Sequence, residues 1–168
     1  MKYNRPGGED ELKIAVTGDT HGQINKVIKA IKKHQADAII FTGDYIRDAK
    51  HLSKQLQLPV YAVAGNCDPP GAGELEKQVE LAGKKLFITH GHRLGVKRGL
   101  QSLYYRTQEV EAQVAVFGHT HTPFCKNVEG TWLINPGSPT YPRGLSLKGT
   151  YVIITVENDK FYPVVWQL

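Results

Sequence analysis

Seven side chains of the types that bind metal ions recur along the sequence in one setting. Five short apolar runs each end beside a small residue, and ligand-type side chains follow at once: Asp19 and His21, Asp44, Asn66, His90, and then His119 and His121. Imidazole nitrogens combined with carboxylate and amide oxygens suit manganese, iron, zinc or nickel. Seven ligands are too many for one tetrahedral zinc ion, and paired cysteines typical of structural zinc sites are lacking. Two metal ions ~3.5–4 Å apart with a shared carboxylate account for the set most simply.

The elements that must position these groups alternate along the first part of the chain. Apolar periodicity predicts strands over Leu12–Thr17, Ala38–Thr42, Pro59–Val63 and Val114–Phe117, and helices over Ile24–Lys33, Asp48–Gln57 and Lys97–Ala112. Alternating strands and helices indicate parallel βαβ units. The carboxyl ends of such strands meet at one crevice, where ligands bind. We therefore expect the seven side chains to face one another.

The remaining strands form predicted hairpins. They pair Gln78–Leu81 with Lys85–Thr89, Phe124–Val128 with Thr131–Ile134, and Tyr151–Val156 with Phe161–Trp166. The prediction is one α/β domain over residues 12–168, preceded by a flexible leader over residues 1–11 that is rich in polar residues and glycine.

The motifs and their order are similar to those of the calcineurin-like metallophosphoesterase superfamily, especially its small bacterial and archaeal YfcE-like phosphodiesterase branch. The matching motifs are Asp19-x-His21, Gly43-Asp44, Gly65-Asn66-x-Asp68, His90-Gly91-His92 and Gly118-His119-Thr120-His121. Residues Ile134–Ser138 also resemble a segment of that branch that forms a loop near the site. The resemblance covers nearly the whole chain from Leu12. It implies a four-layer αββα sandwich, with two mixed β-sheets flanked by helices.

The resemblance also implies a role for each ligand. One metal ion would be held by Asp19, His21, Asp44 and His121, and the other by Asp44, Asn66, His90 and His119. The implied activity is that of a binuclear phosphodiesterase, which hydrolyses small phosphate esters through in-line attack by a metal-bridging hydroxide. Asp44, Asn66, His90 and His119 would be its catalytic residues. The expected cofactor is two divalent metal ions, manganese first, with nickel, iron or zinc as alternatives.

One position departs from the pattern of the superfamily. Many members have histidine after the Gly-Asn pair, where it is thought to protonate the leaving group, but this chain has Cys67 there and retains Asp68. A thiol is a poor general acid unless its pKa is well placed. The sequence therefore predicts a preference for esters with good leaving groups, or an acid from another source.

A second function class stays open at this point. A retromer subunit that resembles this superfamily uses the fold for protein contacts, so a scaffold with little activity is the alternative. The chain has 168 residues and a formal net charge of +5, which suits an anionic ligand but is far from the charge of a nucleic-acid binder. We expect a cytoplasmic protein that acts on a small phosphate ester, with no membrane span and with homo-oligomers possible.

Other candidate residues receive simpler interpretations. His34 and His51 lie on helical stretches and are predicted to be solvated, and both cysteines are predicted to be buried or half-buried thiols. The lysines between residues 26 and 33 form a predicted solvated helix face. His92 lies beside the proposed ligand His90 but is not assigned a role. Arg143 is a candidate for contact with phosphate.

Overall fold

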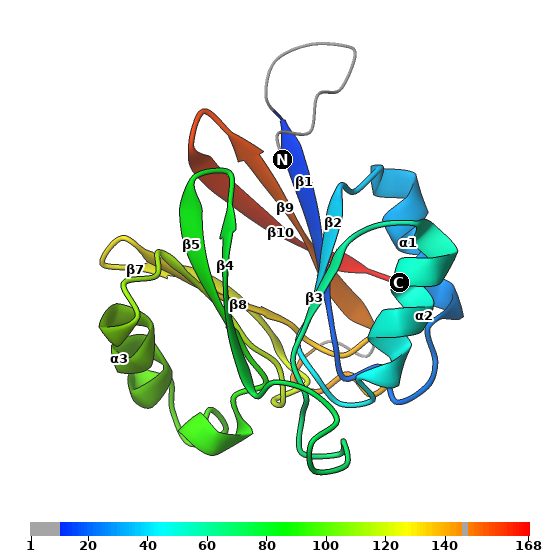
Figure 1. Ribbon diagram of the computed structural model, residues 1–168, viewed down its shortest axis with the longest axis horizontal. Helices are drawn as coiled ribbons and strands as arrows, with labels where there is room; N and C mark the ends of the chain where they lie inside the picture. The colour runs from blue at the N-terminus through cyan, green and yellow to red at the C-terminus, as the bar shows by residue number, and fades with distance from the viewer. Residues whose placement is uncertain (1–10, 146–147) are drawn as a thin grey trace.

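Two five-stranded β-sheets pack face to face between outer layers of helices (Figure 1). The structure, a computed structural model, describes residues 11–145 and 148–168. The first sheet has the order β10 (Lys160–Gln167), β9 (Thr150–Glu157), β1 (Leu12–Thr17), β2 (Ala38–Phe41) and β3 (Val60–Ala62). The second has the order β4 (Glu76–Leu81), β5 (Lys84–Thr89), β6 (Val114–Val116), β8 (Thr131–Pro136) and β7 (Pro123–Val128). The helices are α1 (Asn25–His34), α2 (Arg47–Leu56), α3 (Gln101–Glu109) and the short 3₁₀ helix η1 (His92–Leu94).

Both sheets mix strand directions. In the first sheet β1, β2 and β3 are parallel, whereas β9 runs antiparallel to β1 and β10 antiparallel to β9. In the second sheet β5, β6 and β8 are parallel, and the edge strands β4 and β7 are antiparallel to their neighbours. The parallel strands of each sheet therefore end at a common edge, where ligands can converge.

Alternation along β1 shows how the sequence builds the layers. Ile14 and Val16 point into the core between the sheets, together with Ile88 and Val116 of the second sheet. Ala15 points the other way, into the core beneath α1 and α2. A third core, which includes Leu103 of α3, covers the outer face of the second sheet. The predicted four-layer αββα sandwich is confirmed.

Several predicted boundaries are wrong by a few residues, and one helix is much shorter than predicted. The third helix spans Gln101–Glu109 instead of Lys97–Ala112, because a turn closed by the bond from the Arg98 N–H to the Gly95 carbonyl precedes it and Glu111 adopts a left-handed φ of 55° after it. Strand β8 extends to Pro136, so part of the Ile134–Ser138 segment is strand, not loop. The predicted leader lies, except for Glu11, outside the described residues. In the described ranges no helix is long and apolar enough to cross a membrane.

One histidine prediction is wrong in this region. His34 is half-buried at the end of α1, where its Nε2 lies 2.8 Å from the hydroxyl of Tyr151 and its ring centroid 4.6 Å from that of Trp166. Both partners belong to the C-terminal strands, so a helical pattern alone could not reveal them. His51 on α2 is exposed, as predicted.

Candidate metal centre

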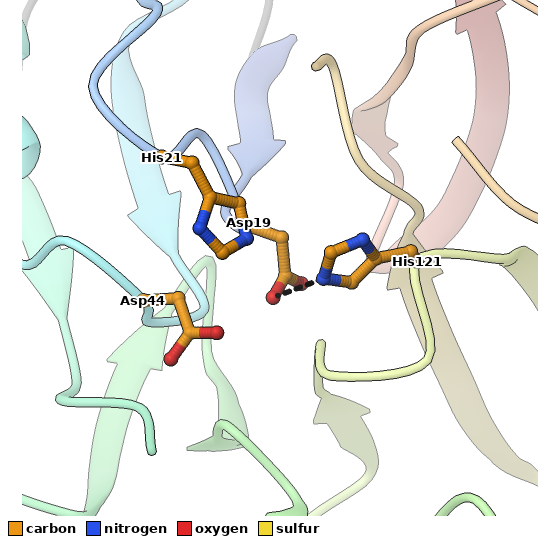
Figure 2. A group of neighbouring side chains, drawn as sticks. All are labelled: Asp19, His21, Asp44 and His121. Atoms are coloured by element: carbon orange, nitrogen blue, oxygen red, sulfur yellow. Dashed lines mark ion pairs between the residues drawn. The ribbon is translucent and has the colours of Figure 1, made fainter. Parts of the chain in front are cut away.

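The seven predicted ligands occupy loops that directly follow five parallel strands. Two of them follow β1, and Asp44, Asn66 and His90 follow β2, β3 and β5 in turn. The last two follow β6. Because the two sheets pack face to face, these loops gather at one edge of the sandwich, and Figure 2 shows four of their side chains together.

Those four side chains form a compact cluster. Asp19, His21, Asp44 and His121 each offer one ligand atom, and these atoms all lie within 4.8 Å of one another. Asp19 is fully buried, Asp44 is 2% exposed and His121 is 8% exposed. The Nε2 atom of His121 lies 3.2 Å from Asp19 Oδ1, the ion pair dashed in Figure 2. The cluster contains the same four residues that the resemblance assigns to one metal ion.

The remaining ligands lie on the other side of Asp44. His90 Nε2 is 3.5 Å from Asp44 Oδ1 and 3.0 Å from Asn66 Oδ1. The ring of His119 is 5.0 Å from that of His90, centroid to centroid, and the half-buried His92 is 5.3 Å from His90. His90 is fully buried, whereas Asn66 is exposed to solvent. Asp44 is thus the carboxylate that faces both groups.

Hydrogen bonds assign the tautomers of two histidines. The Nδ1–H of His90 donates to the carbonyl of Thr42 at 2.8 Å, and that of His121 donates to the carbonyl of Tyr141 at 2.9 Å. Since a carbonyl oxygen can only accept, Nδ1 of each ring carries a proton, and Nε2 is the atom that faces the cluster. Metal-binding histidines are oriented by the same arrangement.

Two buried atoms of the cluster, His21 Nε2 and Asp19 Oδ1, have no hydrogen-bond partner among the described residues, although Asp19 Oδ1 lies 3.2 Å from His121 Nε2. Burial of polar atoms without a hydrogen bond costs free energy unless a donor or a cation compensates. A mixed set of imidazole and carboxylate acceptors fits a divalent cation of the first transition row.

The charge states of Asp44 and His119 suit ligands. Burial acts to raise the pKa of Asp44, but the imidazole of His90 and the N–H of Cys67 outweigh it, so the pKa lies below its usual value. Burial, together with the charges of His90 and Lys97, lowers the pKa of His119 to about 4. At neutral pH the carboxyl group is therefore ionised and the imidazole neutral, the forms in which they bind metal.

Left-handed backbone conformations concentrate at the site. Five of the predicted ligands have φ between 47° and 69°: Asp19, His21, Asp44, His119 and His121. This conformation costs a non-glycine residue roughly 1–2 kcal/mol. Gly65 adds a tight approach, since a Cβ at that position would collide with the carboxylate and the backbone nitrogen of Asp44. Backbone strain of this kind clusters at functional sites.

Ser138 supports the cluster in a way that its sequence did not reveal. Its buried hydroxyl donates to the carbonyl of Asp19 at 2.8 Å and accepts from the N–H groups of Tyr141 and Thr140 at 2.9 and 3.2 Å. The hydroxyl of Thr140 donates to the carbonyl of Thr20 at 2.8 Å. Residues 138–141 are thereby fixed to the loop that carries Asp19 and His21.

Asp48 was also missed, because it reads as an ordinary residue of an amphipathic helix. Its carboxylate is 3% exposed and accepts from the hydroxyl of Thr20 at 2.7 Å and from the N–H of Gly22 at 2.9 Å. These bonds hold the loop on both sides of His21. An acidic residue in the first turn of a helix was the only signal in the sequence.

The loop with Cys67 differs from its prediction. Cys67 is exposed, not buried or half-buried, and its N–H donates to Asp44 Oδ1 at 2.8 Å. Partial desolvation, an interaction with the Asp44 carboxylate and other nearby carboxylates raise the pKa of the thiol to about 11. Asp68 accepts from the N–H groups of Ile46 and Gly65 at 2.7 and 2.8 Å, so it clamps two ligand loops together.

Comparisons with known proteins agree with this geometry. The sequence model of the calcineurin-like phosphoesterase superfamily domain matches residues 12–159. The chain is 34% identical to a probable metallophosphoesterase, YsnB, of Bacillus subtilis, over 88% of this chain and 86% of that protein. It is 27% identical to the phosphodiesterase YfcE of Escherichia coli, over 79% and 82% of the two chains. A predicted phosphoesterase of Streptococcus pneumoniae has a similar crystal structure, with a TM-score of 0.81, 26% identity and coverage of 95% and 91%.

Proposed function

The chain belongs to the calcineurin-like phosphoesterase superfamily, and from that membership we infer that it is a metal-dependent phosphodiesterase acting on small phosphate esters. One observation supports this function most strongly. Four ligand atoms, one from each of the buried or half-buried residues Asp19, His21, Asp44 and His121, lie within 4.8 Å of one another, and two of them have no hydrogen-bond partner among the described residues. Burial of such a cluster costs free energy unless a cation compensates its carboxylate charges.

The two groups of ligands define where the cations would lie. Asp19, His21, Asp44 and His121 would hold one, and Asp44, Asn66, His90 and His119 the other. Two bound divalent ions would lower the pKa of a water molecule and offset the negative charge that builds on a phosphoryl group during in-line displacement. Manganese is the first expectation, with nickel, iron and zinc as alternatives.

Hydrogen bonds from other residues of the chain orient the proposed ligands and hold the Nδ1 protons of two histidines. Asp44 faces both ligand groups, and the N–H of Cys67 fixes its Oδ1. The carbonyls of Thr42 and Tyr141 hold the Nδ1 protons of their histidines, which keeps Nε2 available. The exposed Asn66 lies on the solvent side, where a substrate would approach.

No residue is assigned to protonate the leaving group. The position that carries a histidine in many relatives carries Cys67, so the chain supplies no imidazole there to protonate an alkoxide. We expect esters with acidic leaving groups, such as p-nitrophenol, to react fastest, because they need no proton in the transition state.

Hydrolysis of bis-p-nitrophenyl phosphate tests the proposed function. We expect release of p-nitrophenol with added Mn²⁺ and none with EDTA. Asp44→Asn should lose most of this activity, whereas Asp159→Asn, a change at an exposed turn between β9 and β10, should keep it. If the wild-type protein shows no turnover with manganese, nickel or iron, the catalytic proposal is wrong and a scaffold function takes its place.

A further inference from the structure

Two tyrosine rings flank one of the proposed ligands. The ring of Tyr45 lies 5.3 Å from that of His21, and the ring of Tyr141 lies 5.2 Å from it, both in edge-on geometry. Tyr45 directly follows Asp44 and is half-buried, whereas Tyr141 is 54% exposed. Two aromatic side chains thus contact His21 of the compact ligand cluster, and the ring of Tyr141 is open to solvent.

The exposed ring stands on a fixed backbone. The N–H of Tyr141 donates to the hydroxyl of Ser138 at 2.9 Å, and its carbonyl accepts from His121 at 2.9 Å. A tyrosine offers a large contact area and has few rotatable bonds, so an anchored ring loses little entropy when a ligand covers it. This combination distinguishes Tyr141 from Tyr105 on α3, which is 57% exposed and whose ring contacts that of Tyr104.

Cationic groups accompany the two rings. The guanidinium carbon of Arg47 lies 4.9 Å from the centroid of the Tyr45 ring. Arg143 is exposed, and its backbone N–H donates to the carbonyl of His121 at 3.0 Å. An aromatic surface next to positive charge suits a ligand that joins a flat ring to a phosphate group.

We propose that Tyr141, whose ring contacts His21 of the ligand cluster, is a stacking surface for a flat ring on the substrate. The substrate class is then a phosphodiester in which at least one ester group carries an aryl ring or a nucleobase. This assignment rests on the proposed phosphodiesterase function, because it places the phosphate at the ligand cluster. Tyr141 determines specificity and has no part in the displacement at phosphorus.

Binding of phosphate monoesters tests the assignment without any need for turnover. Calorimetry on the Mn²⁺-loaded protein would compare phenyl phosphate, thymidine 5′-phosphate and methyl phosphate. We expect at least one of the two ligands with a ring to bind about tenfold more tightly than methyl phosphate, because a base stacked on an aromatic side chain gains free energy of binding. A preference for phenyl phosphate alone would identify an aryl ester, and a preference for thymidine 5′-phosphate a nucleoside ester.

Matched variants separate stacking from a structural role. Tyr141→Ala should abolish the preference for a ring, whereas Tyr141→Phe should retain it. Tyr105→Ala, a change at an equally exposed tyrosine, should behave as the wild type. The proposal fails if the wild type binds all three ligands equally or none of them, or if Tyr141→Ala weakens all three alike.

The two proposals fail in different ways. A ring preference without turnover of bis-p-nitrophenyl phosphate would reject the phosphodiesterase function and leave the stacking surface in place. Turnover without a ring preference would reject the stacking surface alone.

Discussion

Replacement of Ser138 by alanine removes three hydrogen bonds at once and leaves their partners in place. The carbonyl of Asp19 lies at a fully buried residue, and the N–H groups of Thr140 and Tyr141 are partly buried. A buried polar group without a partner costs about 1–3 kcal/mol. With one such buried group and two that water can partly reach, Ser138→Ala should destabilise the protein by about 3 kcal/mol. A chain of this length loses about 2–4 °C of melting temperature per kcal/mol, so we expect a decrease of about 6–12 °C.

The same substitution should weaken metal binding, because residues 138–141 carry the carbonyl that orients His121. Loss of such supporting hydrogen bonds lowers metal affinity by about 10–100-fold. Thermal unfolding followed by circular dichroism measures the stability, and calorimetry with Mn²⁺ measures the affinity. Ser53→Ala is the control, since its hydroxyl makes one bond, to the carbonyl of Leu58 on the outer face. A loss of stability no larger than that of Ser53→Ala would refute the hydrogen-bond argument, and an unchanged metal affinity would refute the link to His121.

Three further changes test other parts of the structure. Gly65→Ala should abolish hydrolysis of bis-p-nitrophenyl phosphate through its collision with Asp44, whereas Gly99→Ala, which meets no atom within 4 Å, should keep full activity; equal activity of the two would contradict the collision. Burial and nearby Lys13 and Lys33 lower the pKa of His34 in the folded protein, so the unfolded chain takes up its proton first as pH falls. The free energy of unfolding should therefore decrease as pH falls from about 6.5, the pKa of His34 in the unfolded chain, towards its lower pKa in the folded protein. Urea denaturation between about pH 7.5 and 5 should show a smaller decrease for His34→Gln than for the wild type, and equal decreases would contradict this. Cys67→His should make the rate less dependent on the leaving-group pKa across a series of aryl phosphodiesters, and an unchanged dependence would show that this position does not protonate the leaving group.

Much of the fold and the positions of the ligands followed from short-range patterns. Buried strands and amphipathic helices alternate between residues 12 and 62, and that alternation dictates parallel strands whose carboxyl ends meet. Asp19 and Asp44 stand directly after two such strands, so their approach to each other could be predicted without any knowledge of side-chain contacts. The resemblance added the second sheet and the division of the ligands into two groups.

The groups that hold the ligands in place could not be predicted in the same way. Ser138 and Asp48 act through hydrogen bonds to loops far away in the sequence, and a single hydroxyl or carboxylate carries no periodic signal. His34 has the same limitation, since its partners lie on the C-terminal strands. The short α3 reflects the turn over Gly95–Arg98 before it and the left-handed Glu111 after it, which the apolar spacing over Lys97–Ala112 does not reveal.

Binding of Mn²⁺ to the metal-free protein tests the central claim most directly. A shared Asp44 predicts that calorimetry finds two sites in the wild type and that Asp44→Asn weakens both, because one carboxylate faces both ligand groups. His119→Ala should weaken only the second site, and the exposed control Asp159→Asn should leave both unchanged. Two undisturbed sites in Asp44→Asn, or a single site in the wild type, would contradict the binuclear arrangement.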